Sequence, residues 1–388
     1  MKQTYMSLAA RMLQTFILMI WCIGSYAQNT ETVSPAEMPA DGKKHTMTIY
    51  LKDNTTVSYT KDQLEHVTYL PGVGMKVLLK DAEYSVDYLY SEMDKIEYTN
   101  EANANENANW VDYGWTNYPE AWRLEYPHLN TNVSPTKDAQ KSQVIVKRTE
   151  EFGITYSIEW DNKLIANRWT CYQLHEGNTM STVKRKDDFK ADDEVAVSSQ
   201  LEDYSGSGFS RGHLCPSADR LCSTGQNKQT FFLTNMQPQY QTHNGGLWGR
   251  LEDEVRNFAT DDTKTNAHCD TLYVVKAATI TDKVTINGEE VDGIYTNIKC
   301  NNKLLVPKFF YMALLHYNKE TDTYQAIGIW TDHKNENQSV QNLGDYAISI
   351  DELEKRTGID FFCNLPDEIE QEVEAKCDLS FWKLTKSN

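Results

Sequence analysis

Three segments between residues 206 and 259 decide the fold of this chain: GSGFSRGHLCPSADR at 206–220, TFFLTNMQPQ at 230–239 and HNGGLWGRLEDEVRNFA at 243–259. The first places His213 after glycines and serines that allow close backbone approach. The second contains a short apolar run, Thr230–Leu233, of the kind that forms strands. The third places Asn244 where a helix should begin, a position asparagine favours because its side chain can cap free N–H groups. The predicted order is a strand with the histidine, a second strand and a helix.

Helical periodicity groups the side chains of the third segment. At about 100° per residue, Glu252 lies roughly 80° around the axis from Asn244, and Trp248 falls between them. The two residues stand about 12 Å apart along the axis, so both cannot contact one metal ion directly. Glu252 suits a contact made through water.

These segments resemble the catalytic core of the DNA/RNA non-specific endonucleases, the ββα-metal family. That family's signature is Asp-Arg-Gly-His, then Thr-Asn-x-x-Pro-Gln, then Asn-x-x-x-Trp-x-x-x-Glu. The chain has Arg211-Gly212-His213, then TNMQPQ at 234–239, then Asn244, Trp248 and Glu252. Less sharply, the resemblance extends over about residues 110–385. Ser210 stands where the family usually has aspartate, and we expect this to tune the site rather than abolish activity.

The resemblance implies a role for six residues of this core. His213 would be the general base that deprotonates the attacking water. Asn244 would be the sole protein ligand of a Mg²⁺ ion, with Mn²⁺ as the other candidate. Glu252 would orient metal-bound water. Arg211 and Arg256 would stabilise the phosphate, and Asn235 would brace the site.

Each feature taken singly has a simpler explanation. Asn244 could be only a helix cap, and Glu252 and Arg256 only an i,i+4 ion pair. The run Lys184-Arg185-Lys186 is a candidate for contact with the substrate backbone, but the two aspartates that follow favour a solvated loop. Together, at these spacings and in this order, the core residues favour a metal-dependent endonuclease. The alternative is a catalytically inactive nucleic-acid- or partner-binding protein on the same fold.

The charge of the chain argues against generic nucleic-acid binding. The net charge is −18, and residues 110–388 carry 42 acidic and 29 basic side chains. Neutralising a phosphate backbone requires lysine and arginine. We therefore expect a local basic cleft that contacts the backbone of DNA and RNA without sequence specificity.

The N-terminus reads as an export signal over residues 1–27. Lys2 and Arg11 precede an apolar run that ends at Cys22, and Ser25-Tyr26-Ala27 is a small-x-small cleavage pattern. Lipid anchoring at Cys22 is not expected, because Trp21 stands where a small residue should precede it. We predict an exported protein with no later membrane span, beginning with a flexible lead-in over 28–44.

A two-repeat, β-rich module is predicted over residues 45–99. TIYLKD at 48–53 matches KVLLKD at 76–81, and HVTY at 66–69 matches KIEY at 95–98. The asparagine-rich stretch 100–109 is predicted to be a linker. Residues 110–388 are expected to form an α+β domain with a ββα-metal core on an antiparallel sheet. Its further strand candidates are Gln143–Lys147, Thr155–Glu159, Thr271–Lys276 and Phe309–Leu315, and its helix candidates are Gly245–Ala259 and Ile350–Thr357.

Seven cysteines remain after residue 27, and their spacing contains no CxxC pattern. A structural zinc site is therefore not expected. In an oxidising compartment disulfides are the expected state, and Cys215 and Cys222 are close enough to close one loop.

Overall fold

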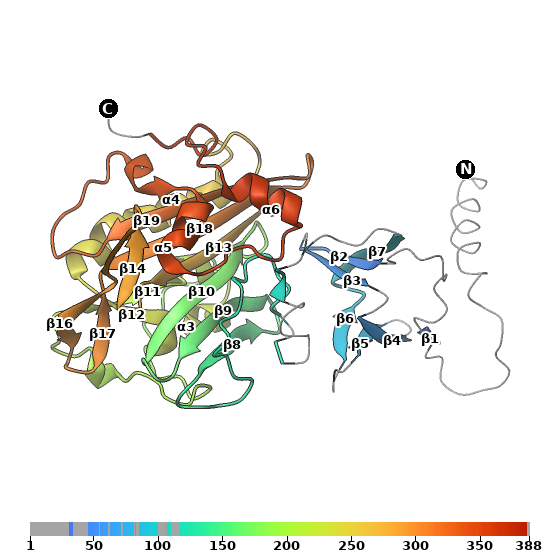
Figure 1. The fold of residues 1–388 in the computed structure, drawn as a ribbon, viewed down its shortest axis with the longest axis horizontal. Helices are drawn as coiled ribbons and strands as arrows, with labels where there is room; N and C mark the ends of the chain where they lie inside the picture. The colour runs from blue at the N-terminus through green and yellow to red at the C-terminus, as the bar shows by residue number, and fades with distance from the viewer. Residues whose placement is uncertain are drawn as a thin grey trace. The chain divides into compact units, whose positions relative to one another are not determined.

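The computed structural model describes residues 31–33, most of 46–99, residues 105, 107–109, 117–118 and 120–385. The chain divides into two compact units, residues 1–103 and 104–388, which Figure 1 shows as ribbons. The signal predicted over 1–27 and most of the lead-in lie outside the described residues. No helix in the described part of the chain combines the length and apolar character needed to span a membrane.

The first unit is built from strands alone in its described part. One sheet has the order β1-β4-β5-β6 and the other β3-β2-β7. The strands are β1 (Glu31–Val33), β2 (Thr46–Leu51), β3 (Thr56–Thr60), β4 (Leu64–Leu70), β5 (Gly74–Leu79), β6 (Val86–Leu89) and β7 (Met93–Thr99). The predicted repeat is visible in this order, because β2, β3 and β4 of the first copy correspond to β5, β6 and β7 of the second.

The two repeats exchange strands. The last strand of each copy pairs with the first strand of the other, β4 with β5 and β7 with β2. Tyr59 on β3 and Tyr88 on β6 occupy equivalent positions, and their buried hydroxyl groups hydrogen-bond to each other. Their rings meet edge to face at 6.4 Å between centroids. Each sheet therefore contains strands from both copies.

The second unit is an α+β domain on a seven-stranded sheet in which all neighbours are antiparallel. The order is β20 (Ala347–Ile348), β19 (Thr323–Asp332), β18 (Phe309–Asn318), β13 (Thr271–Ala278), β10 (Ala166–Leu174), β9 (Gly153–Asp161) and β8 (Ser142–Thr149). Four of the predicted strands are confirmed as parts of β8, β9, β13 and β18. The predicted α+β class is confirmed.

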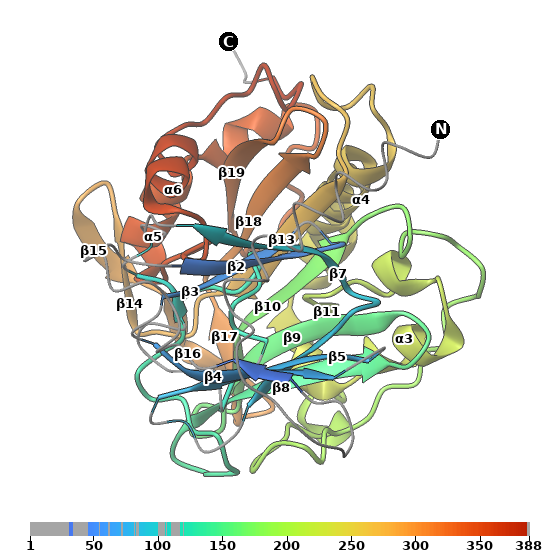
Figure 2. The ribbon, with the colours of Figure 1, turned by 90° about the vertical axis from the view of Figure 1, so that its right-hand side faces the viewer.

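Helices cover both faces of this sheet (Figures 1 and 2). Leu272 and Val274 of β13 pack in one buried cluster with α4 (Gly249–Thr260). Tyr273 and Val275 point to the opposite face, as alternation along a strand requires, and pack with α5 (Ile350–Thr357) and α6 (Asp367–Glu374). The remaining elements are α3 (Thr224–Gln229), β11 (Ser210–His213), β12 (Met236–Gln239), β14 (Lys283–Ile286), β15 (Glu289–Asp292), β16 (Ile294–Cys300) and β17 (Leu304–Pro307).

Helix α5 has the bounds that the sequence predicted. The hydroxyl of Ser349 accepts a hydrogen bond from the backbone N–H of Glu352 at the first turn. Gly358 ends the helix in the left-handed conformation, with φ of 67°, which glycine adopts without strain.

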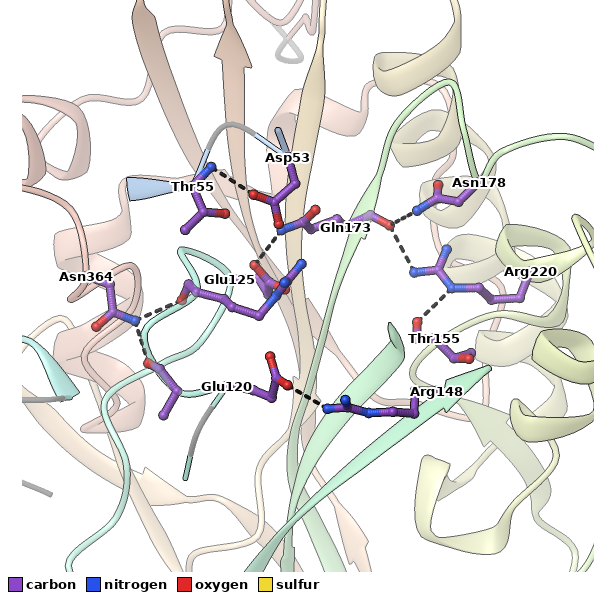
Figure 3. A network of polar contacts seen from close by, with 12 residues as sticks. Asp53, Thr55, Glu120, Glu125, Arg148, Thr155, Gln173, Asn178, Arg220 and Asn364 are labelled. Atoms are coloured by element: carbon purple, nitrogen blue, oxygen red, sulfur yellow. Dashed lines mark hydrogen bonds and ion pairs between the residues drawn. The ribbon is translucent and has the colours of Figure 1, made fainter. Parts of the chain in front are cut away.

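A buried arginine fixes the segment that follows β11. Arg220 donates from Nε to the carbonyl of Thr155, at 2.7 Å, and from Nη2 to the carbonyl of Gln173, at 2.9 Å (Figure 3). Gln173 in turn donates from Nε2 to a carboxylate oxygen of Glu125 at 3.0 Å. The network ties this segment to β9 and β10, beside the candidate site.

The second half of the predicted linker packs within the second unit. Asn105 donates to the carbonyl of Leu365, and Asn109 donates to the carbonyls of Ala121 and Pro127. These bonds satisfy buried amides, because Asn105 and Asn109 are both buried. The unit accordingly begins at Ala104 rather than at residue 110.

The disulfide prediction is wrong for the described cysteines: all seven of them are free thiols. Cys215 points into the core beside α4, where burial raises its pKa to about 12. Cys222 donates instead to Oε1 of Gln226 at 3.2 Å. Short sequence separation did not bring the two sulfur atoms together, because Cys215 faces the core and Cys222 turns toward the Gln226 side chain of α3.

Candidate functional site

The predicted ββα arrangement is present, with a different second strand. β11 pairs antiparallel with β12, which joins His213 to Met236 and Gly212 to Gln237 in register. The prediction of a strand over Thr230–Leu233 is wrong, because this stretch leads from the end of α3 into a 3-10 turn. Its apolar side chains fill the core individually, since Phe231 and Leu233 are fully buried.

Gly212 is required by the close approach of β12. A Cβ atom at this position would lie 2.0 Å from Oε1 of Gln239, far inside contact distance. Gln239 itself donates from Nε2 to Nδ1 of His243 at 2.6 Å. The glycine therefore leaves room for the side chain of Gln239, which holds His243, the residue next to Asn244.

His213 ends β11 with its ring almost entirely enclosed. Its side chain packs edge to face against Phe189 and Phe231. Burial, followed by the positive charges of Arg185 and Arg211, lowers its pKa to about 3. The ring is therefore neutral at neutral pH, and its Nε2 atom is buried with no hydrogen-bond partner among the residues described. It can accept a proton or a hydrogen bond.

Two arginines flank this histidine. The guanidinium of Arg211 stacks 3.8 Å from the ring centroid of Phe189, and that of Arg185 lies 4.9 Å from the centroid of Phe231. Arg211 was predicted here, whereas for the run containing Arg185 a solvated loop was favoured over contact with the substrate backbone. Nothing in the sequence distinguishes Arg185 from the lysines beside it, because its place depends on a fold that brings it to Phe231.

Asn244 lies at the start of the helical segment, but not as a cap. Residues 243–248 form a π-turn that breaks at Gly246, where φ is −105° and ψ is −109°, before α4 begins at Gly249. The predicted single helix over 245–259 is thus interrupted. The backbone N–H of Asn244 donates to the carbonyl of Tyr240 at 2.8 Å. In the described structure its half-buried side-chain amide makes no recorded hydrogen bond, so its oxygen is available.

The segment before Asn244 is held by two buried histidines. His333 accepts at Nε2 from the backbone N–H of Tyr240, at 2.7 Å, and its Nδ1 lies 2.6 Å from the carbonyl of Pro307. His243 has both ring nitrogens engaged, one by Gln239 and the other by Thr331. His243 is therefore not available as a second metal ligand.

Glu252 is mostly buried on the first turn of α4, facing a lysine on the sheet. Nζ of Lys276 lies 3.6 Å from Oε1 of Glu252, and the lysine side chain is completely buried. Burial raises the pKa of Glu252 to about 7, although the charge of Lys276 opposes that rise. The sequence analysis did not assign Lys276 a role. The signal was present, because a charged residue interrupts the apolar strand TLYVVKAA at 271–278.

Arg256 is engaged by two carboxylates. Its Nε and Nη2 each lie 2.9 Å from Oδ1 of Asp219, and its Nη1 lies 3.0 Å from Asp253. Asp219 is buried and also accepts from the hydroxyl of Tyr172 at 2.9 Å. This anchoring aligns the guanidinium one turn beyond Glu252.

Asn235 and Ser210 act on the framework of the site. Asn235 accepts from the backbone N–H of Cys215 at 2.8 Å and donates to the carbonyl of the same residue at 2.9 Å. This closes a ring of hydrogen bonds just beyond His213. Ser210 donates to Oε1 of Gln241 at 2.6 Å, on the segment that leads to Asn244.

The unpartnered buried atoms test whether a hydrated metal ion fits. His213 Nε2, Trp248 Nε1, Glu252 Oε1 and Lys276 Nζ all lack a hydrogen-bond partner among the described residues. Each buried group left unpaired costs about 1–3 kcal/mol, so four in one site indicate missing ligand or water. Oxygen donors from an amide and a carboxylate match the preference of Mg²⁺, which keeps several waters. The residues present fit such an ion.

Comparisons with known proteins identify the family of this chain. Residues 135–368 match the family model described as DNA/RNA non-specific endonuclease. A nuclease of Nostoc sp. is 28% identical over 258 residues, covering 64% of this chain and 83% of the relative. The mitochondrial nuclease EXOG of Xenopus laevis is 26% identical over 234 residues, covering 60% of this chain and 62% of the relative. A crystal structure of an EndoG/EndoGI complex aligns with 22% identity and a TM-score of 0.48, covering 58% of this chain and 88% of that one.

Proposed function

Because the chain belongs to the DNA/RNA non-specific endonuclease family, it is a nuclease of the hydrolase class, and we propose how it works. The proposed reaction is hydrolysis of phosphodiester bonds in both DNA and RNA, leaving 5′-phosphates. His213 is the general base, and Asn244 holds a Mg²⁺ ion. The observation that carries this proposal is the neutral, unpartnered Nε2 of His213 beside two arginines.

His213 takes a proton from the attacking water. A neutral imidazole can do so, but a pKa near 3 would make a weak base. The arginines contribute to that low pKa, and a phosphodiester anion beside Arg185 and Arg211 offsets their charge. Substrate binding therefore raises the basicity of His213 when it is needed.

The family typically uses a divalent metal ion. Bound through the side-chain oxygen of Asn244, Mg²⁺ would supply positive charge to the phosphate as negative charge develops on it. Glu252 offers a carboxylate oxygen that accepts hydrogen bonds from water near the ion. Mn²⁺ has the same ligand preferences and is the other candidate.

The charge distribution supports contact with the backbone alone. The chain carries −18 overall, yet Arg185, Arg211, Arg256 and Lys276 gather around this one site. Contacts to phosphate position a nucleic acid but carry no sequence information. DNA and RNA should therefore both be substrates, without sequence specificity.

Export is a further part of the proposal. It rests on the charged, apolar and small-residue pattern of residues 1–27. N-terminal sequencing of protein recovered outside the cytoplasm should begin at Gln28, and an intact Met1 on that material would refute the proposed signal.

The decisive experiment is cleavage of supercoiled plasmid and of RNA at low salt, with Mg²⁺ or with EDTA. His213→Ala and Asn244→Ala should each abolish metal-dependent cleavage of both polymers. His268→Ala is the matched control, because that histidine is exposed and pairs with Asp262. A folded wild type that cleaves neither polymer with any divalent metal would instead indicate an inactive binding protein.

A further inference from the structure

A second cluster of acidic groups lies on the face of the sheet opposite to α4. Asp351 and Glu354 come from α5, three residues apart, and Glu370 and Glu374 come from α6, four residues apart. These spacings place each pair on one side of its helix. The two helices pack against each other, and Asp360 lies in the segment that connects them.

Three of these residues have the geometry of a cation site. Asp351, Glu354 and Glu374 each offer a carboxylate oxygen, and the three atoms lie within 4.8 Å of one another. A central point is then at most about 2.8 Å from each oxygen, close to the 2.3–2.6 Å of calcium–oxygen bonds. Calcium accepts irregular carboxylate geometry, whereas Mg²⁺ requires about 2.1 Å and a near-ideal octahedron, so carboxylates gathered from two helices favour calcium.

An unpartnered buried oxygen in this cluster points independently to a missing ligand. Glu374 is only 5% exposed, and its Oε1 is buried with no hydrogen-bond partner among the described residues. A buried carboxylate oxygen without a partner is unfavourable. By contrast, Oε1 of Glu354 already accepts from the backbone N–H of Phe361 at 2.7 Å, which orients that carboxylate.

Among the described residues, no ion pair joins Asp351, Glu354 or Glu374 to a basic side chain. Arg356 pairs with Glu352 at 2.8 Å, and Lys376 pairs with Glu372 at 2.6 Å, both away from the cluster. Carboxylates gathered this closely without a basic partner are a favourable site for a cation.

We propose that Asp351, Glu354 and Glu374 bind a calcium ion that clamps α5 to α6. The half-buried positions of Asp351 and Glu354 leave room for water to complete the six to eight ligands that calcium takes. The site is separate from the catalytic centre, because the sheet lies between α5 and α4. The ion stabilises the C-terminal helices and takes no part in hydrolysis.

The test is calorimetric titration of CaCl₂ into the full chain carrying Asn244→Ala, which removes the proposed catalytic metal ligand. One calcium should bind per chain. The melting temperature should rise by roughly 5 °C at a calcium concentration about 100-fold above the dissociation constant. Because this background is inactive under the proposed function, failure of one proposal leaves the other standing.

Glu374→Gln and Glu354→Gln should abolish both the heat of binding and the shift in melting temperature. Glu372→Gln is the matched control, since that residue lies on the exposed side of α6 and pairs outward. Glu374→Gln removes a buried charge, so without calcium it should melt no lower than the wild type. If that variant does not fold, Asp351→Asn, at a half-exposed position, should likewise abolish the heat of binding and the shift in melting temperature.

Three outcomes would overturn the proposal. They are no calcium binding by the parent chain, a calcium shift that persists in Glu374→Gln and Glu354→Gln, and an equal response to Mg²⁺. The first two would mean that the cluster holds protons rather than an ion. The third would remove the assignment to calcium.

Discussion

Nζ of Lys276 lies 3.6 Å from Oε1 of Glu252, and in the described structure neither buried atom has a hydrogen-bond partner. Lys276 projects from β13, in the middle of the sheet, toward the first turn of α4. Its charge also acts on His213 and lowers that residue's pKa. One lysine thus influences both the proposed base and the carboxylate that faces the metal.

Lys276→Met should lower cleavage at pH 7 by about 10- to 100-fold, the usual cost of removing a partner behind a metal site. Without the lysine, the pKa of Glu252 rises above about 7 and the carboxyl becomes protonated at neutral pH. Activity should recover toward pH 9 as the group ionises. A pH–rate profile measured from pH 6 to 9 checks this, and a profile parallel to the wild type would contradict it.

Arg185→Met should lower kcat/KM by about 100-fold, as loss of a charge facing the reacting phosphate does. Because Arg185 lowers the pKa of His213, its removal raises that pKa. The acid limb of the pH–kcat/KM profile should therefore move to higher pH. Lys228→Met, an exposed change on α3, is the control. Arg185 has only a structural role if the variant loses stability but keeps its profile.

Gly212→Ala should reduce cleavage at least tenfold, because the new methyl group would lie 2.0 Å from Oε1 of Gln239. Overpacking of this kind costs about 1–3 kcal/mol of stability. Gln239→Ala in the same chain relieves the clash, so the double variant should regain stability over Gly212→Ala. Denaturation midpoints of the three variants measure this, and an unimproved double variant would show that the clash is not the cause.

His316→Phe should make stability less dependent on pH. His316 packs edge to face against Phe381 and Trp382, and burial lowers its pKa to about 4. A histidine with a depressed pKa contributes stability above its unfolded pKa near 6.5, and that contribution is lost as pH falls toward 4. Urea denaturation at pH 5 and pH 8 should differ by about 2 kcal/mol less in the variant. An unchanged difference would mean that the ring is already charged in the folded state.

A thiol reagent should label about one cysteine of the native chain, because six of the seven described thiols are buried and Cys377 alone among them is partly exposed. All seven should react after denaturation without a reductant. Mass spectrometry of the labelled protein gives both numbers. Fewer reactive thiols in denaturant would reveal disulfides that the structure does not contain.

Local pattern identified four strands of the large sheet and helix α5, which is flanked by a serine that caps it and a glycine that ends it. It did not identify β10, whose sequence ANRWTCYQL mixes polar and apolar residues without regular alternation. The apolar run at Thr230–Leu233 misled because core packing can bury such residues in an irregular turn as well as in a strand. The true second strand contains Pro238, which lowers strand propensity.

The site was predictable only where residues are linked by sequence spacing. Asn244, Trp248 and Glu252 follow one another along a helical segment, so their grouping could be inferred. Arg185 and Lys276 reach the site from distant parts of the chain, through contacts that no spacing records. The kink at Gly246 was also hidden, because glycine is compatible with both a helix and its interruption.

The hydroxyl contact between Tyr59 and Tyr88 joins equivalent positions of the two N-terminal repeats. Since each copy completes the other's sheet, a single copy would be left with open strand edges. Here the other copy closes them, and the equivalent residues Tyr59 and Tyr88 meet between the two copies. The module is thus arranged like a strand-swapped homodimer, with its two subunits in one polypeptide.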